Sequence, residues 1–139
     1  CKSSNPGGAV FQNLEYYDEG LGETSSLYLL IARKVVDWNV NGNAGLIVGA
    51  TYPSELARIR QIAPGLPILV PGIGAQQGSL KQAVKFGIDV EKHNLLISSS
   101  RSVLYASGNV DKYPKAAYEA VSNLNREIND ILTRLDREC

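Results

Sequence analysis

Residues 67–78 run Pro-Ile-Leu-Val-Pro-Gly-Ile-Gly-Ala-Gln-Gln-Gly, a short apolar stretch that leads directly into a glycine-rich loop. An apolar run of this length, bounded by proline and glycine, is typical of a strand buried on both faces of a parallel sheet. Two further runs, 45–50 and 94–98, have the same character. We therefore expect three buried strands, at 45–50, 67–71 and 94–98.

Segments with apolar residues at helical spacing lie between and after these runs. The spacing predicts a helix from Thr24 to about Asn39, and a second that Thr51 caps and Pro53 opens. A short helix is expected over 79–86. The stretch after Pro114 predicts a long amphipathic helix, because its apolar residues recur every three or four positions.

The order of elements decides the fold class. Residues 1–4 resemble the end of a strand and lead into turn chemistry, so the order is β-α-β-α-β-α-β-α. Such alternation predicts an α/β fold of parallel strands, and four units make about half of a (β/α)₈ barrel of roughly 250 residues. We expect one domain over 1–139, the C-terminal half of such a barrel and a fragment of something larger. An open doubly wound domain is the competing architecture.

Composition narrows the classes of partner. The chain has 14 basic and 14 acidic residues and no apolar run that approaches the roughly 18 residues of a membrane span. We therefore expect no nucleic acid and no membrane as partners. With one histidine and two cysteines at the chain ends, we also expect no metal site and a cytoplasmic setting.

The candidate chemistry follows the expected strands. In barrels, ligands bind at the carboxyl ends of strands, and phosphate often binds in the loops after the last two. Those loops would be 71–78, whose glycines let backbone N–H groups approach an anion, and 98–102, which supplies Arg101. The sequence thus predicts a phosphorylated ligand.

Simpler explanations exist for both loops. Glycines after a strand often form only a turn, and a single arginine is usually a solvated surface charge. The spacing of Gly72, Gly74 and Gly78 misses the dinucleotide-binding pattern by one residue, so we expect no nicotinamide or flavin.

Four motifs in this order resemble orotidine 5'-phosphate decarboxylase, closest to its bacterial branch. They are SNPG at 4–7, VGATYP at 48–53, PGIGAQ at 71–76 and the SRS tripeptide at 100–102. The resemblance implies that Ser4 hydrogen-bonds the pyrimidine and that Pro71 packs near the base. It also implies that Gln76 bridges phosphate and pyrimidine, and that Arg101 holds the phosphate. Backbone groups near Gly72, Gly74 and Ser100 would complete the phosphate site; relatives more often have glycine at the position of Ser100.

The resemblance further implies an activity: removal of CO₂ from orotidine 5'-phosphate to give UMP in pyrimidine biosynthesis, without a cofactor. The family's catalytic lysine lies in a D-x-K-x-x-D pattern, which this sequence does not contain. We therefore expect the isolated chain to bind ligand but not to turn it over. It is expected to form a homodimer or to associate with the missing N-terminal half. The alternative is a non-catalytic module that binds phosphorylated ligands or mediates interactions.

Overall fold

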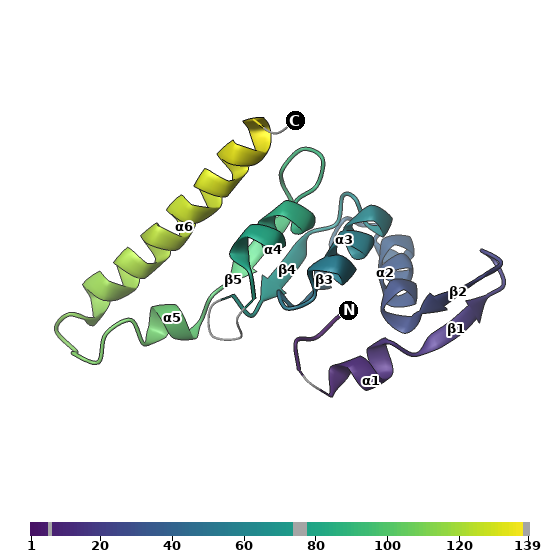
Figure 1. Cartoon of the computed structure of the whole chain (residues 1–139), viewed down its shortest axis with the longest axis horizontal. Helices are drawn as coiled ribbons and strands as arrows, with labels where there is room; N and C mark the ends of the chain where they lie inside the picture. The colour runs from purple at the N-terminus through teal and green to yellow at the C-terminus, as the bar shows by residue number, and fades with distance from the viewer. Residues whose placement is uncertain (6, 74–77, 138–139) are drawn as a thin grey trace.

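The computed structural model describes residues 1–5, 7–73 and 78–137, which form an α/β fold (Figure 1). The elements of these residues, in chain order, are α1 (Gly8–Gln12), β1 (Glu15–Asp18), β2 (Glu23–Ser26), α2 (Leu27–Trp38), β3 (Leu46–Ile47), α3 (Pro53–Ile62), β4 (Ile68–Pro71), α4 (Leu80–Gly87), β5 (Leu95–Ser98), α5 (Arg101–Leu104) and α6 (Tyr113–Arg137).

A parallel sheet with the order β3-β4-β5 forms the centre of the fold. The three expected apolar runs all contribute a strand, although β3 is only two residues long. The strand expected at residues 1–4 is reduced to a single parallel bridge between Lys2 and Val48. The α/β class with parallel strands is therefore confirmed, whereas the half-barrel of four complete units stays a prediction.

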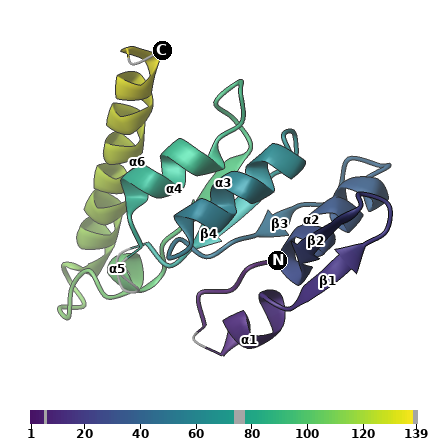
Figure 2. The same ribbon diagram turned by 45° about the vertical axis from the view of Figure 1, so that its right-hand side comes forward.

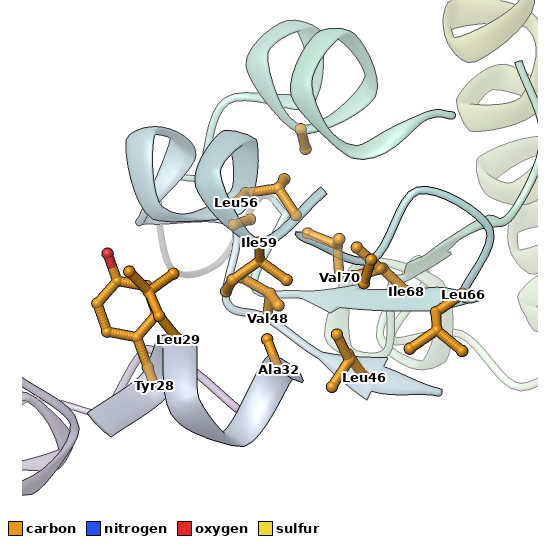
Figure 3. Packing of buried hydrophobic residues seen from close by; sticks show 13 residues of the cluster. Tyr28, Leu29, Ala32, Leu46, Val48, Leu56, Ile59, Leu66, Ile68 and Val70 are labelled. Atoms are coloured by element: carbon orange, nitrogen blue, oxygen red, sulfur yellow. The ribbon is translucent and has the colours of Figure 1, made fainter. Parts of the chain in front are cut away.

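The helices pack in chain order along one face of this sheet. Helix α2 contacts α3, α3 contacts α4, and α4 contacts α6, so these helices lie side by side (Figure 2). Figure 3 shows apolar side chains from α2 and α3 meeting those of β3 and β4. The core residues that this view labels are almost completely buried: Tyr28, Leu29, Ala32, Leu46, Val48, Leu56, Ile59, Leu66, Ile68 and Val70.

The opposite face of the sheet is open. Ile47, Leu69 and Leu96 are partners in the strand register, so their side chains form one row across β3, β4 and β5. Ile47 and Leu96 remain 54% and 53% exposed. The expectation of strands buried on both faces is wrong for the described residues, because no described element covers this second face.

A buried arginine joins the ends of the elements that lie opposite the carboxyl ends of the strands. The guanidinium of Arg60 donates to the carbonyl oxygens of Gly87 (2.5 and 2.8 Å), Leu66 (2.7 Å) and Asn94 (2.8 Å). The Gly87 carbonyl ends α4, and the other two carbonyls precede β4 and β5, so one side chain satisfies backbone acceptors at three places where elements end or begin. Burial lowers the pKa of Arg60 from its usual value.

The segment before α2 contains elements that the sequence patterns did not indicate. It contains α1 and the antiparallel hairpin of β1 and β2. Arg33 on α2 holds the hairpin by donating to the hydroxyls of Tyr16 and Ser25, both at 3.2 Å, and by pairing with Asp18 at 3.5 Å. This contact across elements leaves no periodic signal in the sequence.

The helix ends were predicted with mixed success. The helix expected from Thr24 begins instead at Leu27 as α2, and the cap expected at Thr51 is wrong, because the N-cap positions are Ser26 and Tyr52 and neither side chain accepts a capping hydrogen bond. The helix at 79–86 is confirmed as α4, where Ser79 accepts from the backbone N–H of Gln82. The long terminal helix is confirmed as α6. No helix of the described segments is long and apolar enough to cross a membrane.

Candidate functional site

A cavity of about 400 Å³ lies at the carboxyl ends of the strands. The described residues that line it come from three separate segments, 1–5, 71–73 and 98–102, together with Gln12 and Ile47. Because parallel strands end at the same edge of a sheet, the loops that follow them converge there. The cavity therefore lies where ligands bind in folds of this kind.

The sequence-predicted site residues converge on this cavity. Ser4, Pro71, Gly72, Ser100 and Arg101 all contribute to its lining, although they are as much as 97 positions apart (101 − 4). The remaining two predicted residues, in the loop at 74–77, lie outside the described residues; they are Gly74 and Gln76.

The loop after β4 depends on two glycines. Gly72 has a φ of 99°, a backbone conformation that would be strained for a residue with a side chain. The backbone N–H of Gly78 donates to the Gly72 carbonyl at 3.2 Å and closes the loop. A Cβ at Gly78 would lie 2.4 Å from the Cβ of Ala50, so only glycine fits against Ala50 at this position.

Arg101 begins the short helix α5 directly after β5. Its side chain is exposed and takes part in none of the ion pairs found among the described residues. The hydroxyls of Ser99 and Ser102 lie 2.5 Å apart and fix the segment on either side of it. Arg101 therefore lines the cavity, and none of the ion pairs among the described residues engages its guanidinium.

The turn that contains Ser4 is held by neighbours that the sequence did not indicate. Gln12 at the end of α1 accepts from the backbone N–H of Ser3 at 3.0 Å. The Ser3 hydroxyl accepts from the backbone N–H of Asn5 at 3.1 Å. A Cβ at Gly49 would lie 2.8 Å from the backbone nitrogen of Ser4, so this glycine lets the turn pack closely against the end of β3.

The charge around the cavity suits an anion. Arg101 is an exposed basic residue of the lining, Lys2 also lines the cavity but is fully buried, and no aspartate or glutamate occurs among the lining residues that the structure describes. Hydroxyls, backbone N–H groups and a guanidinium are the donors that proteins use for phosphate oxygens. Within 1–5, 7–73 and 78–137, no group of three His, Cys, Asp or Glu residues is arranged to hold a metal ion.

Fold and site together define the class: an α/β protein with helices packed along a parallel sheet and, at the carboxyl ends of its strands, a cavity lined by hydroxyl and basic residues. Comparison with known proteins gives a more specific resemblance. The chain is 44% identical over 133 residues to orotidine 5'-phosphate decarboxylase of Bordetella avium, covering 94% of this chain and 47% of that protein. It is 45% identical over 130 residues to the Azoarcus enzyme of the same name, covering 93% and 46%.

Solved structures give the same result. The orotidine monophosphate decarboxylase of Leishmania donovani superimposes with a TM-score of 0.74 at 41% identity, covering 94% of this chain and 46% of that chain. The UMP synthase of the same organism gives 0.75, also at 41% identity, with 94% and 26% covered. No family model matches the chain. The resemblance to orotidine 5'-phosphate decarboxylase is thus confirmed, and the chain spans about half the length of the curated relatives it matches.

Proposed function

We propose that this chain supplies the phosphate- and pyrimidine-binding loops of an orotidine 5'-phosphate decarboxylase, the enzyme that releases CO₂ to form UMP. The observation that carries the proposal is the convergence of Ser4, Pro71, Gly72, Ser100 and Arg101 on one cavity. Three segments far apart in the sequence meet there, and the similarity to relatives of that name extends over 94% of the chain.

Arg101 is the proposed anchor of the phosphate. Arg101 is exposed, lines the cavity and takes part in none of the described ion pairs, so binding a phosphate would not require its guanidinium to release a carboxylate. Backbone groups near Gly72, Gly74 and Ser100 would add donors. No metal or organic cofactor enters the proposal.

The pyrimidine lies toward the opposite wall of the cavity in this proposal. Ser4 hydrogen-bonds the ring, Pro71 packs near the base, and Gln76 bridges the two halves of the nucleotide. Ser4 and Pro71 both line the cavity, which supports this division of roles. The role of Gln76 rests on the resemblance alone.

Catalysis requires more than these loops. The family's lysine, set between two aspartates, surrounds the departing carboxylate and protonates the carbon left behind. No D-x-K-x-x-D pattern occurs in the sequence. The 139-residue chain is therefore proposed to bind UMP without decarboxylating orotidine 5'-phosphate by itself.

Isothermal calorimetry with UMP tests the phosphate anchor. Arg101→Ala is expected to weaken UMP binding about tenfold or more, because a hydrogen bond to a charged group contributes about 1.5–3 kcal/mol. Arg126→Ala is the matched control, since Arg126 is exposed on α6 and does not line the cavity. Equal affinities for wild type and Arg101→Ala would remove Arg101 from the phosphate site.

The assembly proposed for the active enzyme follows from the open face of the sheet. Parallel sheets are normally covered on both faces. Here the face that carries Ile47, Leu69 and Leu96 is left open by the described elements, and Ile47 and Leu96 are exposed. The chain is proposed to be half of a (β/α)₈ barrel that closes by association with an N-terminal half or by forming a homodimer.

A second candidate function is a non-catalytic module that binds phosphorylated ligands. The same cavity supports it, because nothing in an anion site requires a catalytic lysine. This module would bind UMP with no dependence on an added N-terminal half. A decarboxylase half would gain turnover when that half is supplied.

A further inference from the structure

Lys2 is a buried cation directly before the turn that contains Ser4. Its residue surface is 0% exposed, and it ranks among the largest fully buried side chains of the described residues. A lysine ammonium is rarely buried to this extent without a partner. None of the ion pairs within the described segments includes Lys2.

Neutral groups stabilise this charge. The Lys2 ammonium donates to the side-chain oxygen of Asn13, at the end of α1. It also lies over the rings of Tyr28, at 5.1 Å from the centroid, and Tyr52, at 4.7 Å. Electron-rich ring faces attract a cation, and the attraction is stronger where water is excluded.

These contacts join parts of the molecule that are distant in sequence. Tyr28 belongs to α2, Tyr52 lies in the VGATYP motif after β3, and Asn13 follows α1. The backbone of Lys2 is fixed as well, because its N–H donates to Ile47 at 3.2 Å and its carbonyl accepts from Gly49 at 2.7 Å. Both the backbone and the side chain of Lys2 are therefore immobilised immediately before Ser3 and Ser4.

We infer that Lys2 is a positioning residue for the pyrimidine side of the site: its ammonium, held by Asn13, Tyr28 and Tyr52, fixes the 3–5 turn against the loop after β3. This inference rests on the proposed function, because it assigns Lys2 to the support of Ser4. Lys2 acts through the turn, since its ammonium is already engaged by Asn13 and the two rings.

Two ligands separate this role from a general structural one. UMP engages both the phosphate loops and the pyrimidine turn, whereas ribose 5-phosphate lacks the base. Lys2→Met keeps the length of the side chain and removes its charge. It is expected to weaken UMP binding about tenfold, because the 3–5 turn loses the cation that holds it, and to leave ribose 5-phosphate binding within about twofold.

Lys2→Arg is the matched conservative variant. A guanidinium stacks on aromatic rings and can donate to the Asn13 side chain, so UMP affinity is expected to return to within about threefold of wild type. If Lys2→Met weakens both ligands equally, or weakens neither, the positioning role is wrong. If wild-type chain binds ribose 5-phosphate but UMP no more tightly, the pyrimidine site itself is wrong and the proposed function fails with it.

A second pair of variants keeps the test valid if Lys2→Met does not fold by circular dichroism. Tyr52→Leu removes one ring from the ammonium, whereas Tyr52→Phe retains it. We expect Tyr52→Leu to reduce UMP affinity selectively by about threefold to tenfold and Tyr52→Phe to bind like wild type. Equal UMP affinity in these two variants would overturn the inference.

Discussion

At the scale of single residues, the site depends on places where no side chain fits. A Cβ at Gly49 would lie 2.8 Å from the Ser4 nitrogen and 2.9 Å from the Ser4 Cβ. Real Cβ atoms do not approach backbone that closely, so the 3–5 turn would have to move outward. Gly49 thus sets how closely the proposed pyrimidine turn approaches β3.

The substitution Gly49→Ala tests this packing. We expect it to lower the free energy of unfolding by about 1–3 kcal/mol, because added volume in a packed region forces backbone shifts. Urea denaturation followed by circular dichroism measures the change. Gly65→Ala is the control, since a Cβ at Gly65 meets nothing within 4 Å and the substitution is expected to stay within about 0.5 kcal/mol. Equal loss of stability in both variants would contradict the packing argument.

Sequence reasoning found some of these residues and missed others for physical reasons. Arg101 and the loop at 71–78 were predicted because the residues that follow a strand in an α/β fold lie at the ligand-binding edge, which depends only on element order, whereas the role of Pro71 was implied by the resemblance. Gly49 and Lys2 were missed as site supports. A close backbone approach leaves no local signal, and a lysine is normally expected in solvent.

At the scale of elements, apolar periodicity predicted the long helix correctly, and the apolar runs predicted the positions of strands but not their open face. Helix α6 and strands β4 and β5 are found where those patterns place them. The β1–β2 hairpin was not predicted, because its polar strands gain their stability from Arg33 on α2, a contact made only in the folded chain.

The connection between α4 and β5 provides a test at this scale. Asp89 organises it by accepting from the backbone N–H of His93 at 2.7 Å, from the Asn94 amide at 2.7 Å and from the backbone N–H of Glu91 at 3.1 Å. These hydrogen bonds, that from His93 foremost, hold the pKa of Asp89 below its usual value of 3.8.

Because the pKa of Asp89 is lower in the folded chain, its carboxylate contributes stability at pH values above 3.8, and this contribution is lost as the pH falls through the folded-state pKa. Asp89→Asn should therefore be less stable than wild type near pH 5, with the difference shrinking below 3.8. Urea denaturation across this range measures it, with the exposed Asp111→Asn as control. A difference that is constant with pH would contradict the assignment.

At the scale of the whole molecule, the sheet has one face and one edge that no described element covers. Its open face carries Ile47, Leu69 and Leu96, and no described strand pairs with the outer edge of β5. Parallel strands with an exposed apolar face tend to find a partner, so we expect the chain to associate. Multi-angle light scattering should show a dimer, and Leu96→Lys should shift it toward monomer. A stable monomer at high concentration would count against this.

The order of elements predicted the α/β class, but it could not predict how the first strand ends. Residues 1–4 contribute one bridge at Lys2 rather than a full strand, because pairing extends only as far as the neighbouring β3. The loop at 74–77, on which Gly74 and Gln76 were predicted, lies outside the described residues.

One end of this sheet is proposed to bind a pyrimidine nucleotide. A titration of the isotopically labelled chain with UMP, followed by two-dimensional NMR of its backbone amides, tests this binding directly. We expect shifts for the amides of 3–5, 72–73 and 99–102, which surround the cavity. Shifts confined to the connection at 89–94, at the other end of the strands, or no shifts at millimolar UMP, would contradict it.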